Sequence, residues 1–214
     1  MKILVTAATL SELHFINSSD SVSLANMGIG VVSTMYNLSK LLKNKYDLVL
    51  NIGIAGSFSK KLRMGEVVSV SSETFGDFGV AGKDGFTTCF EENIVPADMF
   101  PYSNGVLKSV NAWKISKDLS VQSVNGLTNN TVSGEESLIK RMRDKFSPDI
   151  ETMEGAAFFY VCLMENVPFA EIRAISNMVE SRDKSRWDIL PAIRNLSDKV
   201  NFYLDKICFE GDIL

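Results

Sequence analysis

The chain has 214 residues, of which 45% are hydrophobic and 22% charged, with 22 lysines and arginines against 26 aspartates and glutamates. This composition is typical of one globular domain, because a chain of this length buries roughly 70% of its unfolded surface without disulfides or metals. The net charge of −4 and the lack of a run of five basic residues argue against nucleic acid or an anionic membrane surface as partner. A small-molecule ligand remains open.

The cysteines and the amino terminus point to a protein of the cytoplasm. Cys89, Cys162 and Cys208 are too far apart in the sequence for the spacing of a zinc site or a redox pair. No run of 18 apolar residues occurs, and the apolar stretch at the start of the chain is too short for a signal peptide. We therefore expect reduced thiols, a cytoplasmic protein and no membrane partner.

Residues 1–56 predict a βαβ unit. Residues 3–7 and 21–27 read as short strands, and the second is followed by a glycine turn. Residues 31–45 carry apolar side chains at helical spacing, and residues 48–52 return to a buried strand. The glycine-rich segment 53–56 is expected to close that strand.

The middle of the chain is less regular. Residues 67–70 predict a strand, followed by a glycine-rich stretch at 73–85 and a poorly patterned region to about residue 116. A loop that covers a substrate is expected in this region, because long irregular segments often carry function. Residues 119–124 and 130–133 read as strands.

The last third returns to alternating helices and strands. Residues 135–145, 155–165 and 187–208 predict helices, and residues 169–176 predict a strand between the last two. This alternation favours an α/β fold with a twisted, largely parallel sheet. No repeat or linker divides the chain, so a single domain is expected.

Polar residues follow several of these strands, where ligands bind in open α/β sheets. Four places meet this condition: Glu12, residues 51–56, residues 151–155, and Ser176 with Asn177. Glu12 also fits the first turn of a helix capped by Ser11 or Thr9. A carboxylate at 154 also fits a helix N-terminus, where the dipole contributes under about 1 kcal/mol.

Two common alternatives find no support in these segments. The segment 53–56 is not a dinucleotide-binding or Walker motif, because residue 58 is Phe and no Gly-Lys-Ser/Thr follows. By itself it favours a tight turn. His14, the only histidine, has no Ser or Cys partner motif, so we interpret it as structural or as lying at the rim of a site.

Taken together, the four places form an ordered pattern. The segments are Glu12, Asn51-x-Gly53-x-Ala55-Gly56, Met153-Glu154-Gly155-Ala156-Ala157 and Arg173-Ala174-Ile175-Ser176-Asn177. This order resembles the purine nucleoside phosphorylase superfamily, which includes the methylthioadenosine/adenosylhomocysteine nucleosidases, over nearly the whole chain. Residues 176–189 are similar to the futalosine hydrolases, the nucleosidases of the futalosine route to menaquinone. The resemblance implies one domain over residues 1–214 with a twisted, mixed central sheet flanked by helices.

The resemblance also implies roles for single residues. Glu12 would activate the water that attacks C1′ of the ribose, Glu154 would hold the 2′- and 3′-hydroxyls, and Met153 would pack beneath the sugar. Asn177 would contact the base, and Asp183 would relay a proton toward N7. The remaining substrate-binding residues would be Ile54, Ala55, Gly56, Thr152 and Ser176. No metal or organic cofactor is implied.

Two departures from the methylthioadenosine-type pattern bear on the substrate. Those enzymes have an aspartate where this chain has Asn177 and commonly a serine where it has Ile54. A carboxamide accepts from a protonated N7 and donates to a 6-oxo group, so Asn177 argues for hypoxanthine over adenine. Together with this preference, the resemblance of residues 176–189 implies hydrolysis of the N-ribosidic bond of futalosine, releasing hypoxanthine and dehypoxanthine futalosine.

Several alternatives stay open. The substrate is alternatively 6-amino-futalosine, methylthioadenosine or inosine, and the chain is alternatively a phosphorylase or a purine-binding sensor. Residues 1–17 contain no arginine for a phosphate dianion, which favours hydrolysis. Candidates to contact the benzoate arm or the base are Arg182, Lys184, Arg186, Phe75, Phe78, Phe86 and Trp187. By resemblance we expect a homo-oligomer, with neighbour contacts from residues 77–85 or 99–102.

Overall fold

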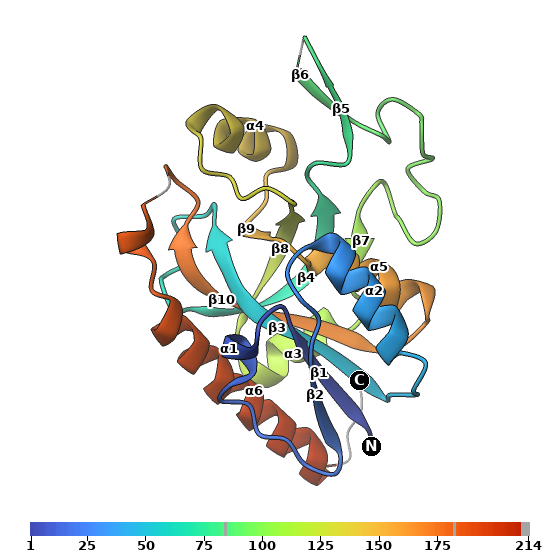
Figure 1. Ribbon diagram of the computed structural model, residues 1–214, viewed down its shortest axis with the longest axis vertical. Coiled ribbons are helices and arrows are strands. Elements are labelled where there is room, and N and C mark those ends of the chain that lie inside the picture. The colour runs from blue at the N-terminus through green and yellow to red at the C-terminus, as the bar shows by residue number, and fades with distance from the viewer. Residues whose placement is uncertain (84, 182, 211–214) are drawn as a thin grey trace.

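The computed structural model describes residues 1–83, 85–181 and 183–210 (Figure 1). The strands are β1 (Ile3–Ala7), β2 (Val22–Asn26), β3 (Leu48–Ser57), β4 (Val67–Phe75), β5 (Gly79–Gly82), β6 (Gly85–Thr88), β7 (Leu107–Lys108), β8 (Gln122–Thr128), β9 (Ile150–Thr152) and β10 (Phe169–Met178). The helices are α1 (Leu10–Leu13), α2 (Val31–Leu41), α3 (Ala112–Leu119), α4 (Glu136–Phe146), α5 (Gly155–Met164), the 3-10 turn η1 (Lys184–Arg186) and α6 (Ile189–Glu210).

A mixed sheet forms the centre of the molecule, as the resemblance implied. Its strands run in the order β10-β4-β8-β9-β3-β1-β2, and β10 also pairs with β3. The pairing therefore closes into a ring through β3, β10, β4, β8 and β9, with β1 and β2 as an extension. β1, β2, β3 and β10 are parallel, whereas β4 runs antiparallel to β10 and β9 antiparallel to β3.

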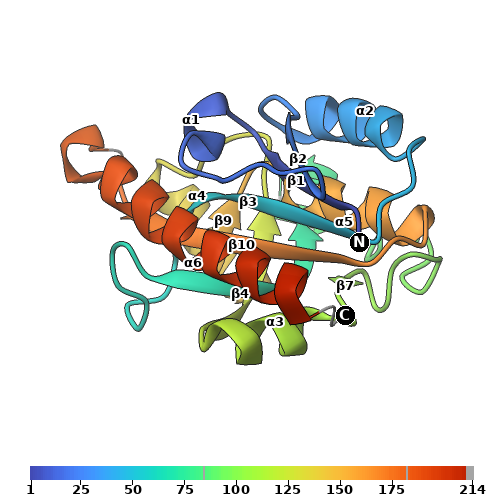
Figure 2. The same ribbon diagram turned by 90° about the horizontal axis from the view of Figure 1, so that it is seen from below.

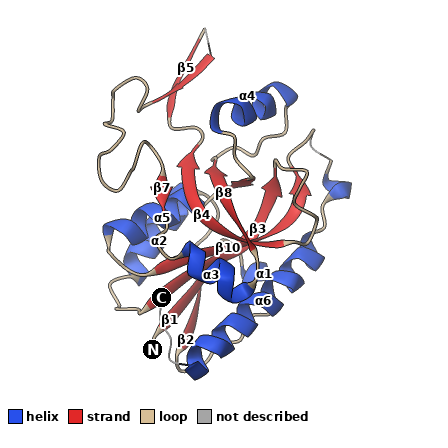
Figure 3. Cartoon of the chain, turned by 180° about the vertical axis from the view of Figure 1, so that it is seen from behind, coloured by secondary structure: helices blue, strands red, loops and turns tan. Residues whose placement is uncertain are grey.

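Helices cover both faces of the sheet (Figures 2 and 3). α3 and α6 lie on one face, where Ile115, Leu196 and Tyr203 pack against β1, β3 and β10. α2 and α5 lie on the other, where Leu38 and Phe158 join a second apolar cluster. Buried apolar contacts on both faces leave the strand ends as the place where polar side chains gather.

The glycine-rich segment 53–56 does not turn, which corrects the sequence interpretation. β3 continues through it to Ser57, because β10 runs parallel beside it and pairs Gly53 with Arg173 and Ile175 with Ala55. A local glycine signal was overridden by a strand more than 100 residues away in the chain. The segment is thus held as a rigid wall.

Most of the other differences lie between β4 and β10 in the sequence. Residues 130–133 form no strand, because Asp77 Oδ2 holds Asn130 by accepting from its backbone N and from Nδ2 at 2.9 and 3.1 Å. The hairpin β5–β6 begins in the glycine-rich stretch and extends three residues beyond it. α3 begins in the poorly patterned region and ends at Leu119, with Ile115 and Leu119 buried. β9 was also not predicted. α2 ends at Leu41, earlier than expected.

Within the residues that the structure describes, no helix is long and apolar enough to cross a membrane. The same residues contain no group of three or more His, Cys, Asp and Glu side chains arranged to hold a metal ion. The cysteines Cys89, Cys162 and Cys208 are free.

Candidate functional site

A cavity of about 400 Å³ opens where β1, β3, β9 and β10 end. Its walls come from segments far apart in the sequence: Ala8, Thr9, Ser11, Glu12, Ile29, Ile54, Ala55, Gly56, Val132, Glu151, Thr152, Met153, Glu154, Ser176, Asn177, Trp187, Ile189 and Ile193. Every residue predicted to be catalytic or to bind the sugar lines this cavity, with the exception of Asp183. The four motifs therefore meet in one place, as the strand-end rule predicts.

Glu12 is fixed at one side of the cavity by its own helix start. Thr9 caps α1 and its backbone N and Oγ1 donate to Glu12 Oε2 at 3.0 and 2.8 Å, while the Ile54 backbone N donates to Glu12 Oε1 at 3.1 Å. The side chain is 5% exposed. Each carboxylate oxygen can accept two hydrogen bonds, and Oε1 accepts one from Ile54, so it keeps one acceptor position for a ligand or water.

Glu154 occupies the start of α5. The Gly30 backbone N donates to Glu154 Oε1 at 2.9 Å, across 124 residues of sequence. Burial raises the pKa of Glu154, and the guanidinium of Arg173, 4.0 Å from Oε2, opposes that rise. A carboxylate in this setting binds hydroxyl groups strongly when it is ionised.

Arg173 places a buried positive charge close to the two carboxylates, a role that the sequence reasoning missed. Burial alone would lower the pKa of Arg173, but Glu171, Glu154 and Glu12 raise it above its ordinary value. Its Nε donates to Glu171 Oε1 at 2.6 Å. The available signal was the pair of opposite charges, Glu171 and Arg173, inside a mostly apolar strand, since a buried cation requires anionic partners.

Gly53 makes room for this arrangement. A Cβ at that position would lie 2.2 Å from Arg173 Nη1 and 2.7 Å from Glu12 Oε1. The absence of a side chain at Gly53 therefore allows charged side chains to lie close to the backbone of β3, and the glycine does not form a turn.

Another buried carboxylate, Glu151 on β9, anchors the loop that contributes Val132 to the cavity wall. Its Oε1 accepts from Asn129 Nδ2 at 3.0 Å and from Ser133 Oγ at 2.5 Å. Burial raises the pKa of Glu151 against these hydrogen bonds. Because Val132 lies between the two anchored residues and lines the cavity, Glu151 fixes the shape of that wall.

Asn177 lies at the edge of the cavity with its amide oriented by neighbours. Ser176 Oγ donates to Asn177 Oδ1 at 2.8 Å, and Asn177 Nδ2 donates to the Met178 carbonyl at 3.0 Å. The oxygen can accept one further hydrogen bond, and the nitrogen has a second proton to donate. The side chain thus offers one acceptor and one donor side by side.

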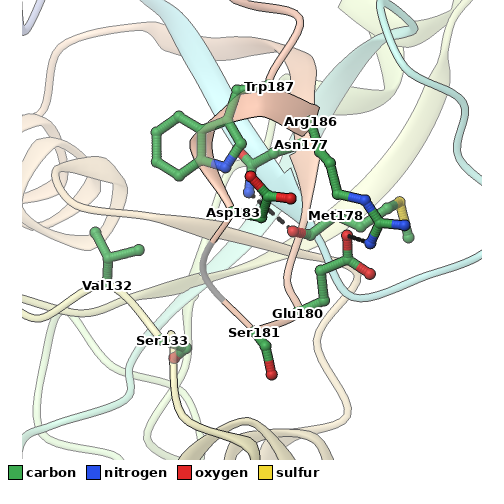
Figure 4. Close-up of a pocket in the computed structure, with 9 residues that line it drawn as sticks. All are labelled: Val132, Ser133, Asn177, Met178, Glu180, Ser181, Asp183, Arg186 and Trp187. Carbon is green, nitrogen blue, oxygen red and sulfur yellow. Dashed lines mark hydrogen bonds and ion pairs between the residues drawn. The ribbon is translucent and has the colours of Figure 1, made fainter.

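Asp183 does not line the main cavity but lies in an adjoining pocket, together with Asn177. It lines a small pocket of about 20 Å³ that shares Val132, Asn177 and Trp187 with the main cavity (Figure 4). Its Oδ1 accepts from Ser185 N and Oγ at 3.0 and 2.6 Å, and these bonds lower the pKa of Asp183. These bonds engage Oδ1 alone, and the proton-relay role of Asp183 stays a prediction.

The candidates for the benzoate arm are mostly not in the cavity. Trp187 lines it, whereas Phe75, Phe78 and Phe86 do not. Arg186 is exposed and donates to Glu180 at 2.7 Å. Arg182 and the side chain of Lys184 lie outside the described residues. His14 is exposed and contacts the ring of Phe15, away from the cavity lining.

Comparison with known proteins agrees with this architecture. A futalosine hydrolase of Thermus thermophilus is 28% identical over 174 residues, covering 81% of this chain and 76% of the relative. A 5′-methylthioadenosine/S-adenosylhomocysteine nucleosidase of Maridesulfovibrio salexigens is 31% identical over 172 residues, covering 77% and 71%. A crystal structure of such a nucleosidase from Colwellia psychrerythraea, in complex with adenine, has a TM-score of 0.81 at 20% identity, covering 96% of this chain and 95% of that one.

The family model described as the phosphorylase superfamily matches residues 8–202. That range includes the carboxylate at 12, the glycine-rich part of β3, the start of α5 and the end of β10, which are the segments that build the cavity. The chain belongs to the phosphorylase superfamily.

Proposed function

We propose that this protein hydrolyses the N-ribosidic bond of futalosine and releases hypoxanthine, in the route to menaquinone. The observation that carries the proposal is the cavity that places Glu12 and Glu154 beside one buried guanidinium, with a carboxamide, Asn177, at its edge. The 28% identical futalosine hydrolase supports the substrate. The scattered, free cysteines are consistent with the cytoplasm as the place of action.

In this proposal Glu154 and Glu12 have different roles in the reaction. Glu154 accepts from the ribose 2′- and 3′-hydroxyls, and its negative charge stabilises the oxocarbenium-like sugar as the bond from C1′ to N9 breaks. The bonding electrons pass to the purine, which gains a proton from solvent at N7, and this proton balances the one that the attacking water loses. Glu12 removes a proton from the water whose oxygen bonds to C1′. The positive charge of Arg173 lies close to both carboxylates and favours their ionised forms.

The cavity lining favours water over phosphate as the nucleophile. Among the described residues that line it, none is a lysine or arginine. Arg173 lies behind the wall and is engaged by Glu171. A phosphate dianion would therefore meet two carboxylates without an available cation, which is unfavourable.

Release of hypoxanthine in phosphate-free buffer tests the proposal. We expect futalosine to be cleaved without phosphate, with hypoxanthine and dehypoxanthine futalosine formed in equal amounts. Cleavage that requires phosphate would establish a phosphorylase instead. Hypoxanthine binding without turnover of any nucleoside would establish a sensor. The 31% identical nucleosidase makes 5′-methylthioadenosine the second substrate to assay.

Asn177 should set the preference for a 6-oxo base. A 6-amino base presents a donor to the Asn177 amide nitrogen, and the unpaired group costs roughly 1–3 kcal/mol, or about 5- to 150-fold in kcat/KM. We therefore expect futalosine to be preferred over its 6-amino analogue, and Asn177→Asp to narrow or invert that preference.

Both substrates are measured on the wild type, Asn177→Asp and the control Asn177→Ala. The alanine variant should lose rate on both substrates and retain little preference, because it removes the donor and the acceptor together. If the wild type cleaved the 6-amino analogue as well as futalosine or better, Asn177 would not be the residue that recognises the base.

We also propose a homo-oligomer in which a second copy covers the mouth of the cavity. Ile29 lines the cavity and is 60% exposed, and it continues into an apolar strip with Val32 and Tyr36 on α2. Apolar surface that adjoins a site in this way is typical of an interface. Met99 and Phe100, in one of the two segments predicted to contact a neighbour, are exposed as well.

Light scattering at micromolar concentration tests the oligomer. We expect a mass of at least twice that of the chain, and a monomer for Val32→Asp, whose exposed position tolerates a charge in the isolated chain. The variant should also lose activity, because one wall of the site is then missing. A monomeric wild type with full activity would contradict the oligomer.

A further inference from the structure

Glu73, on β4, is fully buried behind the cavity and does not line it. Its carboxyl group occupies a slot between two glycines. A Cβ at Gly126 or at Gly155 would each lie 2.1 Å from Glu73 Oε1. The backbone of β8 and the first residue of α5 are thus shaped around this one carboxyl group.

Two threonine hydroxyls surround it. Thr128 Oγ1 lies 2.8 Å from Glu73 Oε2, Thr152 Oγ1 lies 3.3 Å from Glu73 Oε1, and the two hydroxyl oxygens are 3.0 Å apart. Each of these three contacts requires a proton, but two hydroxyls supply only two. A protonated Glu73 supplies the third and closes a ring in which every group donates once.

The charges around Glu73 favour the same state. Burial raises the pKa of Glu73 well above its ordinary value, and the neighbouring Glu171 raises it further, against the hydrogen bonds and Arg173. Glu171, in turn, interacts with Arg173, Glu154 and Cys162. These are the charged or titratable side chains from β10 and α5 that surround the cluster, and they include a single cation. When Glu73 is neutral, the positive charge of Arg173 is balanced by Glu171 and Glu154.

The ring is connected to the start of α5. The side chain of the N-cap residue, Glu154, makes no capping hydrogen bond to this helix. Instead, the Gly155 backbone N donates to Thr152 Oγ1 at 3.3 Å, and the Ala156 backbone N donates to Thr128 Oγ1 at 2.7 Å. The threonines therefore satisfy the free N–H groups of the first turn, and Glu73 fixes the threonines.

We propose that Glu73 is a positioning residue that works as a neutral carboxylic acid, fixing the start of α5 and through it the carboxylate of Glu154. Its effect on the sugar rests on the proposed function, whereas its effect on α5 does not. Glu73 touches no reacting atom. Its role is to keep Glu154 at the distance from the ribose that catalysis requires.

The variants Glu73→Gln and Glu73→Leu test the proposal. Glutamine is neutral and retains one donor and one acceptor, so we expect kcat/KM for futalosine within about threefold of the wild type. Leucine of similar size removes both, so kcat/KM should fall by about 10²-fold, mostly through KM, because a displaced Glu154 grips the ribose poorly. Loss of activity in Glu73→Gln equal to that in Glu73→Leu would overturn the proposal.

Stability against pH provides a readout that does not depend on activity. With its pKa raised in the folded state, Glu73 favours folding least when pH is high, because the unfolded chain ionises from about pH 4.5 upward and the folded protein does not. The free energy of unfolding of Glu73→Gln should therefore increase relative to that of the wild type as pH rises from 5 to about 9. The infrared C=O band of a protonated carboxylic acid should disappear in the same variant.

Glu165→Gln, at the exposed end of α5, is the matched control and should follow the wild type at every pH. A difference between wild type and Glu73→Gln that does not change with pH would show that Glu73 is ionised, and would overturn the proposal. If the wild type cleaves no nucleoside while this pH difference is present, the proposed function fails and the neutral state of Glu73 stands.

Discussion

Glu12→Gln should bind futalosine with little change in affinity while hydrolysis falls by roughly 10²–10⁴-fold, the usual contribution of a general base. The amide can still contact the water but cannot take its proton. Binding is measured by calorimetry with a slowly cleaved or non-hydrolysable nucleoside, and the chemical step by single-turnover release of hypoxanthine. A drop in kcat with an unchanged dissociation constant is the expected signature.

Thr9→Val is the matched control for this experiment. It removes the hydroxyl that donates to Glu12 Oε2 but leaves the carboxylate bound by the backbone N–H groups of Thr9 and Ile54. The loss of a cap costs about 1 kcal/mol of stability, and the rate should fall by no more than about tenfold. Near wild-type turnover in Glu12→Gln would show that the water is activated by another group.

Glu154→Gln should damage both binding and chemistry. It weakens two charge-assisted hydrogen bonds to the ribose and removes the negative charge beside the developing cation, so we expect kcat/KM to fall by roughly 10²-fold or more. Arg173 also loses one of its three carboxylate partners, so the melting temperature must be measured alongside the rate.

A 2′-deoxy analogue of the substrate separates the two effects. If Glu154 binds the 2′-hydroxyl, removing that hydroxyl should slow the wild type strongly and the variant hardly at all. The pH profile provides a second check. Because burial raises the pKa of Glu154, kcat/KM of the wild type should decline with falling pH earlier than an ordinary carboxyl predicts, and Glu154→Gln should lose that decline. Additive effects of the two changes would contradict the contact.

The sequence by itself determined the elements whose signals are local. β1, α5 and β10 are found within two residues of their predicted bounds at each end, because apolar periodicity and chain-breaking residues act over a few neighbours. The Thr9 cap with Glu12 three residues later is a local signal of the same kind. The ordered motifs also identified most of the cavity lining, since the carboxyl ends of the strands bring such segments together.

Only the tertiary structure decided how those residues are held. The local sequence around Gly53 predicts a turn. In the structure β10 pairs with β3 there, and Gly53 is the position where Arg173 lies close to the backbone. Glu154 accepts from Gly30, 124 residues away, and Glu73 lies between Gly126 and Gly155. A buried charge is stable only with partners that satisfy it, and such partners come from any part of the chain that the fold brings near. Local pattern therefore places these residues in strands and helices, whereas their protonation and orientation follow from the packed structure alone.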